Sequence, residues 1–405
     1  MADGTAAPST ARFARKREAI IAAATVILNR EGVKGATLAD VAASVGLITT
    51  SVTYYFKKKE DLAAACFLSS IERLDALIAE AMREPTPEQR LHRIFDLYLS
   101  LDRAIRQGEA PAIAYLSDLR ALSEDILEPV WLALVELYRR LSALFDPGGA
   151  IDQRGAMARA YVLMEQIFWS PAWLFRYDLE DYPRIRDRMV DILMHGLAAP
   201  DAVWDPVLLA SACERAAPAT PQETFLLAAT RLINQLGYRG ASVEKISAEL
   251  NVTKGSFYHH NDAKDDLVVA CFEHSFEVIR RVQTAGQQLD GDQWTRLSSI
   301  ARTLAEHQLS DRGPLLRASA LSALPQPIRE HMVEQSSRIS GRFAAMISDG
   351  IADGSIRPVD PTIAAQMLNA TLNAAADLRA SQSGVTREEV GAFYAKPMLM
   401  GLFSR

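Results

Sequence analysis

An internal repeat constrains this chain more than any other feature of its sequence. When the 405 residues are shifted by 205 positions, "AATVILNREGVKGATLADVAASVG" aligns without a gap on "AATRLINQLGYRGASVEKISAELN". The shift places Gly32 on Gly237, and it places the Ala-Cys-Phe of 65–67 on the Ala-Cys-Phe of 270–272. An ungapped run with matching apolar spacing indicates a tandem duplication, so we expect two related units in one chain.

Nearly all of the remaining sequence carries a helical pattern. Apolar residues recur at three- and four-residue spacing in "RLHRIFDLYLSLDRAI", "EPVWLALVELYRRLSALF" and "RIRDRMVDILMHGL". This spacing is typical of amphipathic helices, whereas the alternating pattern of strands between turn residues is missing. The sequence therefore predicts an all-α protein.

Composition and motifs exclude several classes of protein. The net charge of −6 argues against a general coating of nucleic acid, but it is compatible with a local basic patch. The three cysteines form no CxxC pair, which favours reduced thiols, a cytoplasmic location and no zinc site. No apolar run suits a signal peptide or a membrane span. Because GxSxG, HExxH, GxGxxG and P-loop spacings are also missing, we expect neither an enzyme nor a cofactor or metal site.

Each copy begins with a pattern of short helices separated by a turn. In the first copy Thr37 is predicted to cap a second helix, Gly46 supplies the turn, and a third helix spans about 49–55. Val52 and Phe56 then face the core. The side chains that project outward are Thr49, Thr50, Thr53 and Tyr54. A helix of this kind can enter the major groove of DNA, where hydroxyl groups contact base edges and phosphates.

These residues resemble the DNA-binding domain of the TetR family, the tetracycline-repressor-like regulators. The family pattern is roughly T-x-x-x-IA-x-x-x-GVS-x-G-[TS]-[LF]-Y-x-[YH]-F-x-x-K-x-x-L. The first copy matches it at Thr37, Val41-Ala42, Gly46-Leu47, Ser51, Tyr55, Phe56, Lys59 and Leu62. The second copy matches it at Ser242, Ile246, Val252-Thr253, Gly255, Ser256, Phe257, Tyr258, His260, Lys264 and Leu267.

The resemblance implies contacts with double-stranded operator DNA from both copies. In the first copy the implied DNA-binding residues are Thr37, Thr49, Thr50, Ser51, Thr53, Tyr54, Tyr55 and Lys59. In the second copy they are Ser242, Thr253, Lys254, Gly255, Ser256, Tyr258, His259 and Lys264.

The two copies differ in charge and in one core position. Residues 1–60 hold nine Lys or Arg against five acidic residues, whereas residues 218–265 hold five of each. Asn261 also stands where the family has a core Phe. Since phosphate neutralisation supplies much of DNA affinity, we predict that the N-terminal head binds DNA more strongly. Its basic arm, "ARFARKRE", either reaches phosphates or a minor groove, or forms a disordered tail.

The resemblance further implies that each head precedes a helical domain that binds a small ligand and dimerises. The expected fold is thus two tandem TetR-like units, each with a three-helix helix-turn-helix head. The predicted boundaries are 12–67 and 220–272 for the heads, 68–198 and 273–405 for the helical domains, and 199–219 for a proline-rich linker.

An aromatic-rich segment at 161–182 could line an apolar ligand pocket, or it could belong to the core or to a dimer interface. The candidate ligand-binding residues are Tyr161, Phe168, Trp169 and Trp173 in the first copy, and Met332, Met346 and Met367 in the second. No convergent set of polar residues identifies a ligand beyond its apolar character.

The sequence therefore predicts a sequence-specific transcriptional regulator, a repressor that a small apolar ligand releases from operator DNA. The alternative is a ligand-binding or scaffolding helical protein in which one or both heads have degenerated. The two copies pair either within one chain, as a pseudo-dimer, or between chains, as a homodimer. A membrane partner is not expected.

Overall fold

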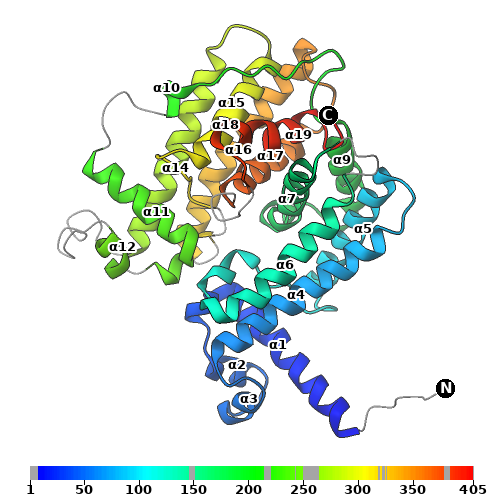
Figure 1. The fold of residues 1–405 in the computed structure, drawn as a ribbon, viewed down its shortest axis with the longest axis vertical. Coiled ribbons are helices and arrows are strands. Elements are labelled where there is room, and N and C mark those ends of the chain that lie inside the picture. Colours follow the sequence, from blue (N-terminus) through cyan, green and yellow to red (C-terminus); the bar gives the residue numbers. More distant parts are fainter. Residues whose placement is uncertain are drawn as a thin grey trace.

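The first repeat fills one side of the computed structural model, which describes residues 8–145, 151–213, 220–241, 243–249, 264–317, 320–321, 324, 326–377 and 384–404. Its head contains α1 (Pro8–Gly35), α2 (Leu38–Ser44), α3 (Thr49–Tyr55) and the start of α4 (Lys59–Ala81), and it forms one end of the molecule in Figure 1. The body adds α5 (Pro87–Arg106), η1 (Leu116–Ala121), α6 (Glu124–Ser142), α7 (Gln153–Trp169), α8 (Pro171–Leu174), η2 (Leu179–Asp181) and α9 (Tyr182–His195).

The second repeat follows the same order. After α10 (Ala210–Cys213), its elements are α11 (Pro221–Gly240), α12 (Val243–Glu249), α14 (Lys264–Gln287), α15 (Gln293–Leu309), α16 (Gln326–Asp353), α17 (Pro361–Asp377), α18 (Arg387–Val390), η4 (Gly391–Ala395) and α19 (Lys396–Met400). Across the described ranges the regular structure is helical, apart from an isolated bridge between Ala198 and Ile356. The predicted all-α class is confirmed. None of the helices described has both the length and the apolar character needed to span a bilayer.

The duplicated heads repeat each other in backbone detail. Gly32 interrupts α1 with a φ of 67°, and Gly237 interrupts α11 with a φ of 71°. Such positive φ values favour glycine, and they kink the long first helix of each head near its C-terminal end. The buried thiol of Cys66 donates to Ile21 O at 3.6 Å, and its counterpart Cys271 donates to Leu226 O at 3.7 Å.

The repeat continues into the helical bodies, with three residues fewer in the second copy. Asn29 Nδ2 donates to Ile113 O at 2.7 Å, and Asn234 Nδ2 donates to Leu315 O at 2.9 Å. In both copies, therefore, an asparagine of the first helix holds the segment that follows α5 or its counterpart α15. The heads align with a shift of 205 residues, whereas this segment aligns with a shift of 202 (113 to 315).

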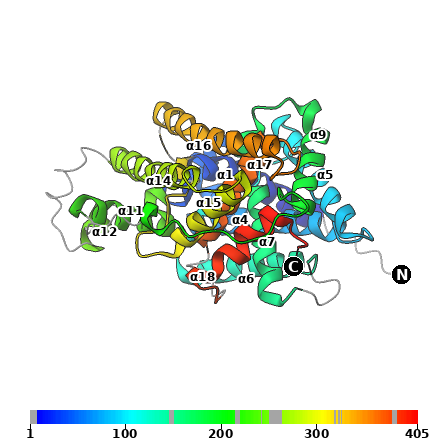
Figure 2. The same ribbon diagram turned by 90° about the horizontal axis from the view of Figure 1, so that it is seen from above.

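The two bodies pack against each other along α7 and α17, which lie near the centre of the molecule (Figures 1 and 2). Helix α9 of the first repeat also contacts α17, and η4 of the second repeat contacts α7. Polar contacts cross the same junction. Arg357 pairs with Asp191 at 2.8 Å, Arg188 pairs with Asp360, and Arg159 Nε donates to Leu402 O at 2.7 Å.

The described part of the predicted linker, 199–213, runs along the second repeat. The backbone N–H of Val207 donates to Ser299 Oγ at 2.9 Å, and that of Leu209 donates to Thr303 Oγ1 at 3.0 Å. Both hydroxyl groups belong to α15, so this segment is attached to the second body before its head begins. It ends in the short helix α10.

Candidate nucleic-acid interface and cavity

The first head holds a capped helix, a tight turn and an exposed helix. The Thr37 hydroxyl accepts a hydrogen bond from Asp40 N at 3.1 Å, and it donates to the Asp40 carboxylate at 2.6 Å. This cap fixes the start of α2. Gly46 then takes a φ of 64°, and the N–H of Leu47 donates to Ala42 O at 2.8 Å, which closes the turn before α3.

Helix α3 has one buried face and one exposed face. Val52 and Phe56 are buried in the head, where α3 packs against α2. Thr49, Thr50 and Tyr54 are exposed, the last by 68%. The remaining predicted DNA-binding residues of this helix, Ser51, Thr53 and Tyr55, are half-buried. The exposed face therefore carries the hydroxyl and phenol groups that the spacing predicts, except that Thr53, expected to project outward, is half-buried.

The N-terminal part of α1 packs beside this helix. The ring of Phe13 lies 4.7 Å from that of Tyr55 and 6.0 Å from that of Tyr54, between centroids. The Arg17 guanidinium lies over the Phe56 ring at 5.2 Å. The basic arm at 11–18, for which the sequence leaves a groove-binding segment and a disordered tail open, is part of α1 and adjoins α3.

The three lysines after α3 do not share one role. Lys57 and Lys58 are exposed. Lys59 Nζ donates to Lys34 O at 2.8 Å and thereby joins the end of α1 to the start of α4. Lys34 Nζ in turn lies 3.1 Å from Glu60 Oε1, and this hydrogen bond lowers the pKa of Glu60. The link from Lys59 to the Lys34 carbonyl cannot be read from the sequence, because it joins positions 25 apart.

Most of the predicted DNA-binding residues of the second head fall outside the described residues. Ser242, Thr253, Lys254, Gly255, Ser256, Tyr258 and His259 lie outside the described residues, and the same holds for Asn261. Lys264 begins α14. The first helix of this head, α11, starts with a capping box between Thr220 and Glu223, and it contacts both η1 and α1 of the first repeat. The two heads therefore touch through their first helices.

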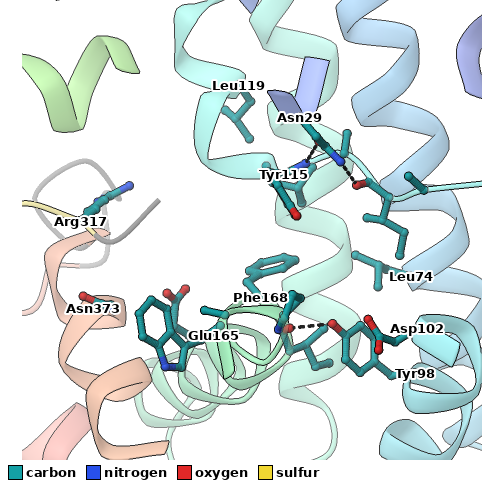
Figure 3. Close-up of a pocket in the computed structure, with 18 of the residues that line it drawn as sticks. Asn29, Leu74, Tyr98, Asp102, Tyr115, Leu119, Glu165, Phe168, Arg317 and Asn373 are labelled. Carbon is teal, nitrogen blue, oxygen red and sulfur yellow. Dashed lines mark hydrogen bonds between the residues drawn. The ribbon is translucent and has the colours of Figure 1, made fainter. Parts of the chain in front are cut away.

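A cavity of about 460 Å³ opens in the body of the first repeat, between α4, α5, η1, α6 and α7 (Figure 3). Three of the predicted ligand-binding residues, Tyr161, Phe168 and Trp169, line it. The other aromatic side chains in its wall are Tyr98, Tyr115, Trp131, Tyr138 and Phe175. Asn29 brings the first head to the edge of the same cavity.

A hydrogen-bonded carboxylate lies at the α5 side of the cavity. Asp102 accepts from the Tyr182 hydroxyl at 2.6 Å and from Arg106 Nε at 2.7 Å. Tyr98, its neighbour in Figure 3, donates to Ile167 O at 3.0 Å. Burial raises the pKa of Tyr98, and the Asp102 carboxylate raises it further, so this hydroxyl group stays protonated.

The other predicted ligand-binding residues lie elsewhere. Trp173 is buried against Tyr177, with the ring centroids 5.9 Å apart, and does not line the cavity. Met332, Met346 and Met367 are buried in the second repeat. The sequence reasoning missed the lining residues of α5 and α6, since their amphipathic pattern shows that they are buried but not that they face a cavity.

The cavity wall connects to the head through a short chain of hydrogen bonds. Ser123, the residue just before α6, donates from Oγ to Glu60 Oε2 at 3.1 Å. Glu60 also accepts from Lys34 at the end of α1. Because η1 and α6 line the cavity, a shift of the junction between them would move Ser123 and so disturb its hydrogen bond to Glu60 and the link from Glu60 to Lys34.

Family comparisons match this arrangement in both halves. The model described as bacterial regulatory proteins, tetR family, matches residues 20–66 and again 225–271. The model described as tetracyclin repressor-like, C-terminal domain, matches residues 290–402. Each head match covers the helix-turn-helix region found from the sequence.

Individual relatives cover part of the chain. The Transposon Tn10 TetC protein of Escherichia coli is 26% identical over 157 residues, which are 36% of this chain and 78% of that protein. An uncharacterized HTH-type transcriptional regulator of Mycobacterium tuberculosis (strain ATCC 25618 / H37Rv) is 29% identical over 119 residues, or 29% of this chain and 58% of that protein.

Solved structures give similar coverage. The crystal structure of apo AibR is 23% identical with a TM-score of 0.36, and it covers 44% of this chain and 97% of its own. PfmR, a TetR family transcriptional regulator from Thermus thermophilus, is 20% identical with a TM-score of 0.38, at 45% and 99% coverage. With two matches to the head model and one to the C-terminal domain, the chain belongs to the tetR family of bacterial regulatory proteins, and it carries the family's N-terminal unit in tandem.

Proposed function

We propose that this protein is a sequence-specific repressor that leaves its operator when a small apolar ligand binds. The observation that carries the proposal is the exposed face of α3. Thr49, Thr50 and Tyr54 are exposed there, and the exposed Lys57 and Lys58 follow directly after the helix. Side chains on such a helix can read base edges in the major groove, while lysines neutralise phosphates. Thr37, Ser51, Thr53, Tyr55 and Lys59 remain proposed contacts of the same head.

We propose that the two repeats pair within one chain. The contacts between them are reciprocal, because α9 of the first repeat meets α17, and the corresponding segment of the second repeat, η4, meets α7. A two-fold interface has this property. Light scattering at micromolar concentration should therefore give the full-length protein the mass of one 405-residue chain. A mass of two chains would support the homodimer.

We also propose the domain boundaries given above, with heads at 12–67 and 220–272 and helical bodies at 68–198 and 273–405. The family matches at 20–66 and 225–271 fall inside the proposed heads, and the match at 290–402 falls inside the second body. The described linker residues are attached to α15, which supports placing the junction of the repeats before 199.

The cavity supports the ligand-binding part of the proposal. Its volume of about 460 Å³ suits a small organic molecule, since such sites commonly enclose about 300–1,000 Å³. A ligand that contacts η1 and α6 would act through Ser123 and Glu60 on the first head. Release then requires that the ligand bind more tightly to a head arrangement that does not fit DNA.

A gel shift on the DNA upstream of the protein's own coding region tests DNA binding. At 50 mM salt the full-length chain should retard this duplex, and at 200 mM the affinity should fall steeply, because counterions compete for the phosphates. A variant with Lys57→Ala and Lys58→Ala should bind more weakly and lose affinity less steeply with salt. If the wild-type chain shifts no duplex at low salt, the ligand-binding or scaffolding alternative is favoured.

A further inference from the structure

The cavity of the first repeat also has walls from the second repeat. Arg317, Leu321, Val333 and Asn373 line it together with the residues of the first repeat. Figure 3 shows Arg317 and Asn373 on the side opposite Tyr98 and Asp102. The site therefore lies where the two repeats meet.

One of these second-repeat residues is the counterpart of a first-repeat residue in the same cavity. The N–H of Tyr115 donates to Asn29 Oδ1 at 2.8 Å, and the N–H of Arg317 donates to Asn234 Oδ1 at 3.1 Å. Asn29 and Asn234 correspond under the shift of 205 residues. Tyr115 and Arg317 are therefore equivalent positions, and both face one cavity.

A second equivalent pair comes from α7 and α17. Both helices begin after a capping aspartate, since Asp152 accepts from Gly155 N at 2.7 Å and Asp360 accepts from Ile363 N at 3.1 Å. Counted from these caps, Glu165 and Asn373 occupy the same helical position, 13 residues on. Both line the cavity.

The remaining two residues complete the pattern. Helices α6 and α16 begin at positions 124 and 326, which again differ by 202. With this shift Leu119 corresponds to Leu321, and Trp131 corresponds to Val333. All four cavity residues of the second repeat are thus counterparts of cavity residues in the first. A cavity that is lined by equivalent positions of both repeats lies on the pseudo-two-fold axis that relates the repeats.

We propose that this axial cavity is a single ligand site per chain, shared by both repeats, and that it takes a planar aromatic molecule. The proposal rests on the ligand-responsive function above and adds the number, place and class of the ligand. The lining is rich in aromatic rings, which favour stacking with flat ligands. The paired positions differ in chemistry, Tyr against Arg and Glu against Asn, so the two sides of the site are unlike. An asymmetric molecule can therefore bind in one orientation.

The axial position explains how one ligand would act on two heads. Helix η1, which lines the cavity, packs against α1 of the first head and α11 of the second. A ligand that moves η1 changes the surface on which both first helices rest. One binding event then alters the spacing of both heads, and no second pocket is required.

The test uses the full-length chain without DNA and the neutral aromatic probe N-phenyl-1-naphthylamine, which carries a flat naphthalene ring and whose fluorescence rises in apolar surroundings. Titration should saturate at one probe per chain. Val333→Trp places an indole in the cavity from the second repeat and should weaken binding at least tenfold. The matched control is Glu334→Trp, the next residue of α16, whose side chain is exposed and whose substitution should leave binding unchanged.

Asn373→Phe, on α17, fills the same cavity from a different helix and should also weaken binding at least tenfold. If Val333→Trp loses the melting transition that Glu334→Trp retains, Asn373→Phe decides the result. Saturation at two probes per chain, no saturable binding, or wild-type affinity in a folded cavity variant would overturn the shared site. The gel shift is a separate measurement, made without the probe. If the probe-free chain does not bind DNA but the chain still binds one probe, the repressor function is refuted and the shared site is not.

Discussion

Gly196 and Gly401 occupy the same position in the two repeats, 205 residues apart, and their backbones meet where the bodies join. A Cβ atom on Gly401 would lie 2.5 Å from Met194 O, and one on Gly196 would collide with Leu399 O. Both glycines also have positive φ, 68° and 99°. Near its C-terminal end each repeat therefore has a residue without a side chain, because the other repeat's backbone occupies that space.

Replacing Gly401 by alanine should destabilise the folded chain by more than its dihedral angles alone require. The positive φ costs about 1–2 kcal/mol, and the collision with Met194 O adds about 1–3 kcal/mol. Gly354→Ala is the control, because Gly354 has a φ of 81° and open space around it. Guanidinium denaturation of both variants measures the excess. Equal losses would show that the junction tolerates a methyl group.

His307 should make stability depend on pH. Burial lowers the pKa of His307 to about 3, and its Nδ1 has no hydrogen-bond partner in the described structure. The unfolded chain binds this proton below about pH 6.5, so stability present at pH 7 is lost as the pH falls toward 3. At pH 4.5 the loss should reach roughly 2–3 kcal/mol. His307→Gln should remove it, which urea unfolding at pH 7 and 4.5 measures. The prediction is refuted if the wild-type protein and His307→Gln differ in unfolding free energy by the same amount at pH 7 and at pH 4.5.

Two variants of the first head should separate sequence reading from general DNA affinity. Thr49→Ala combined with Tyr54→Ala removes exposed polar contacts and should abolish the preference for the operator over a scrambled duplex. Lys57→Ala should weaken both duplexes alike. Competition gel shifts measure the ratio. A double variant that still prefers the operator would show that another surface reads the bases.

Two of the three cysteines, Cys66 and Cys271, should be inert in the folded protein. Burial raises the pKa of Cys66 to about 11 and that of Cys271 to about 12, so little thiolate forms near pH 8. Ellman's reagent should label neither thiol in buffer and both in 6 M guanidinium. Mass spectrometry of the labelled peptides identifies each site. Rapid labelling of Cys66 in buffer would mean that the first head opens on the time scale of the reaction.

Local features of the sequence were the ones that predicted structure well. The cap at Thr37, the turn at Gly46 and the buried Val52 each depend on residues only a few positions away, and the structure has all three. The repeat itself was visible because duplication leaves a direct trace in the sequence. The DNA-facing roles of α3 stay predictions, supported by exposure.

Long-range contacts set the limit of that reasoning. Trp131 and Tyr98 carry the ordinary pattern of buried helix residues, and only the packing of α5 and α6 turns them toward a cavity. Lys59, a proposed phosphate contact, also donates to Lys34 O, and the sequence does not reveal this link between positions 25 apart. The contribution of Arg317 depends on how two repeats meet, which neither repeat encodes alone.

The linker segment 199–213, which forms hydrogen bonds to Ser299 and Thr303 of α15, has a consequence for how this protein can evolve. A tether of this kind keeps each half at a high effective concentration near the other. Because both repeats belong to one chain, their pairing does not depend on a separate subunit, and mutations need not preserve recognition between identical subunits. On the proposed pairing within one chain, the second head can change in charge and sequence while the first head keeps the contact with DNA.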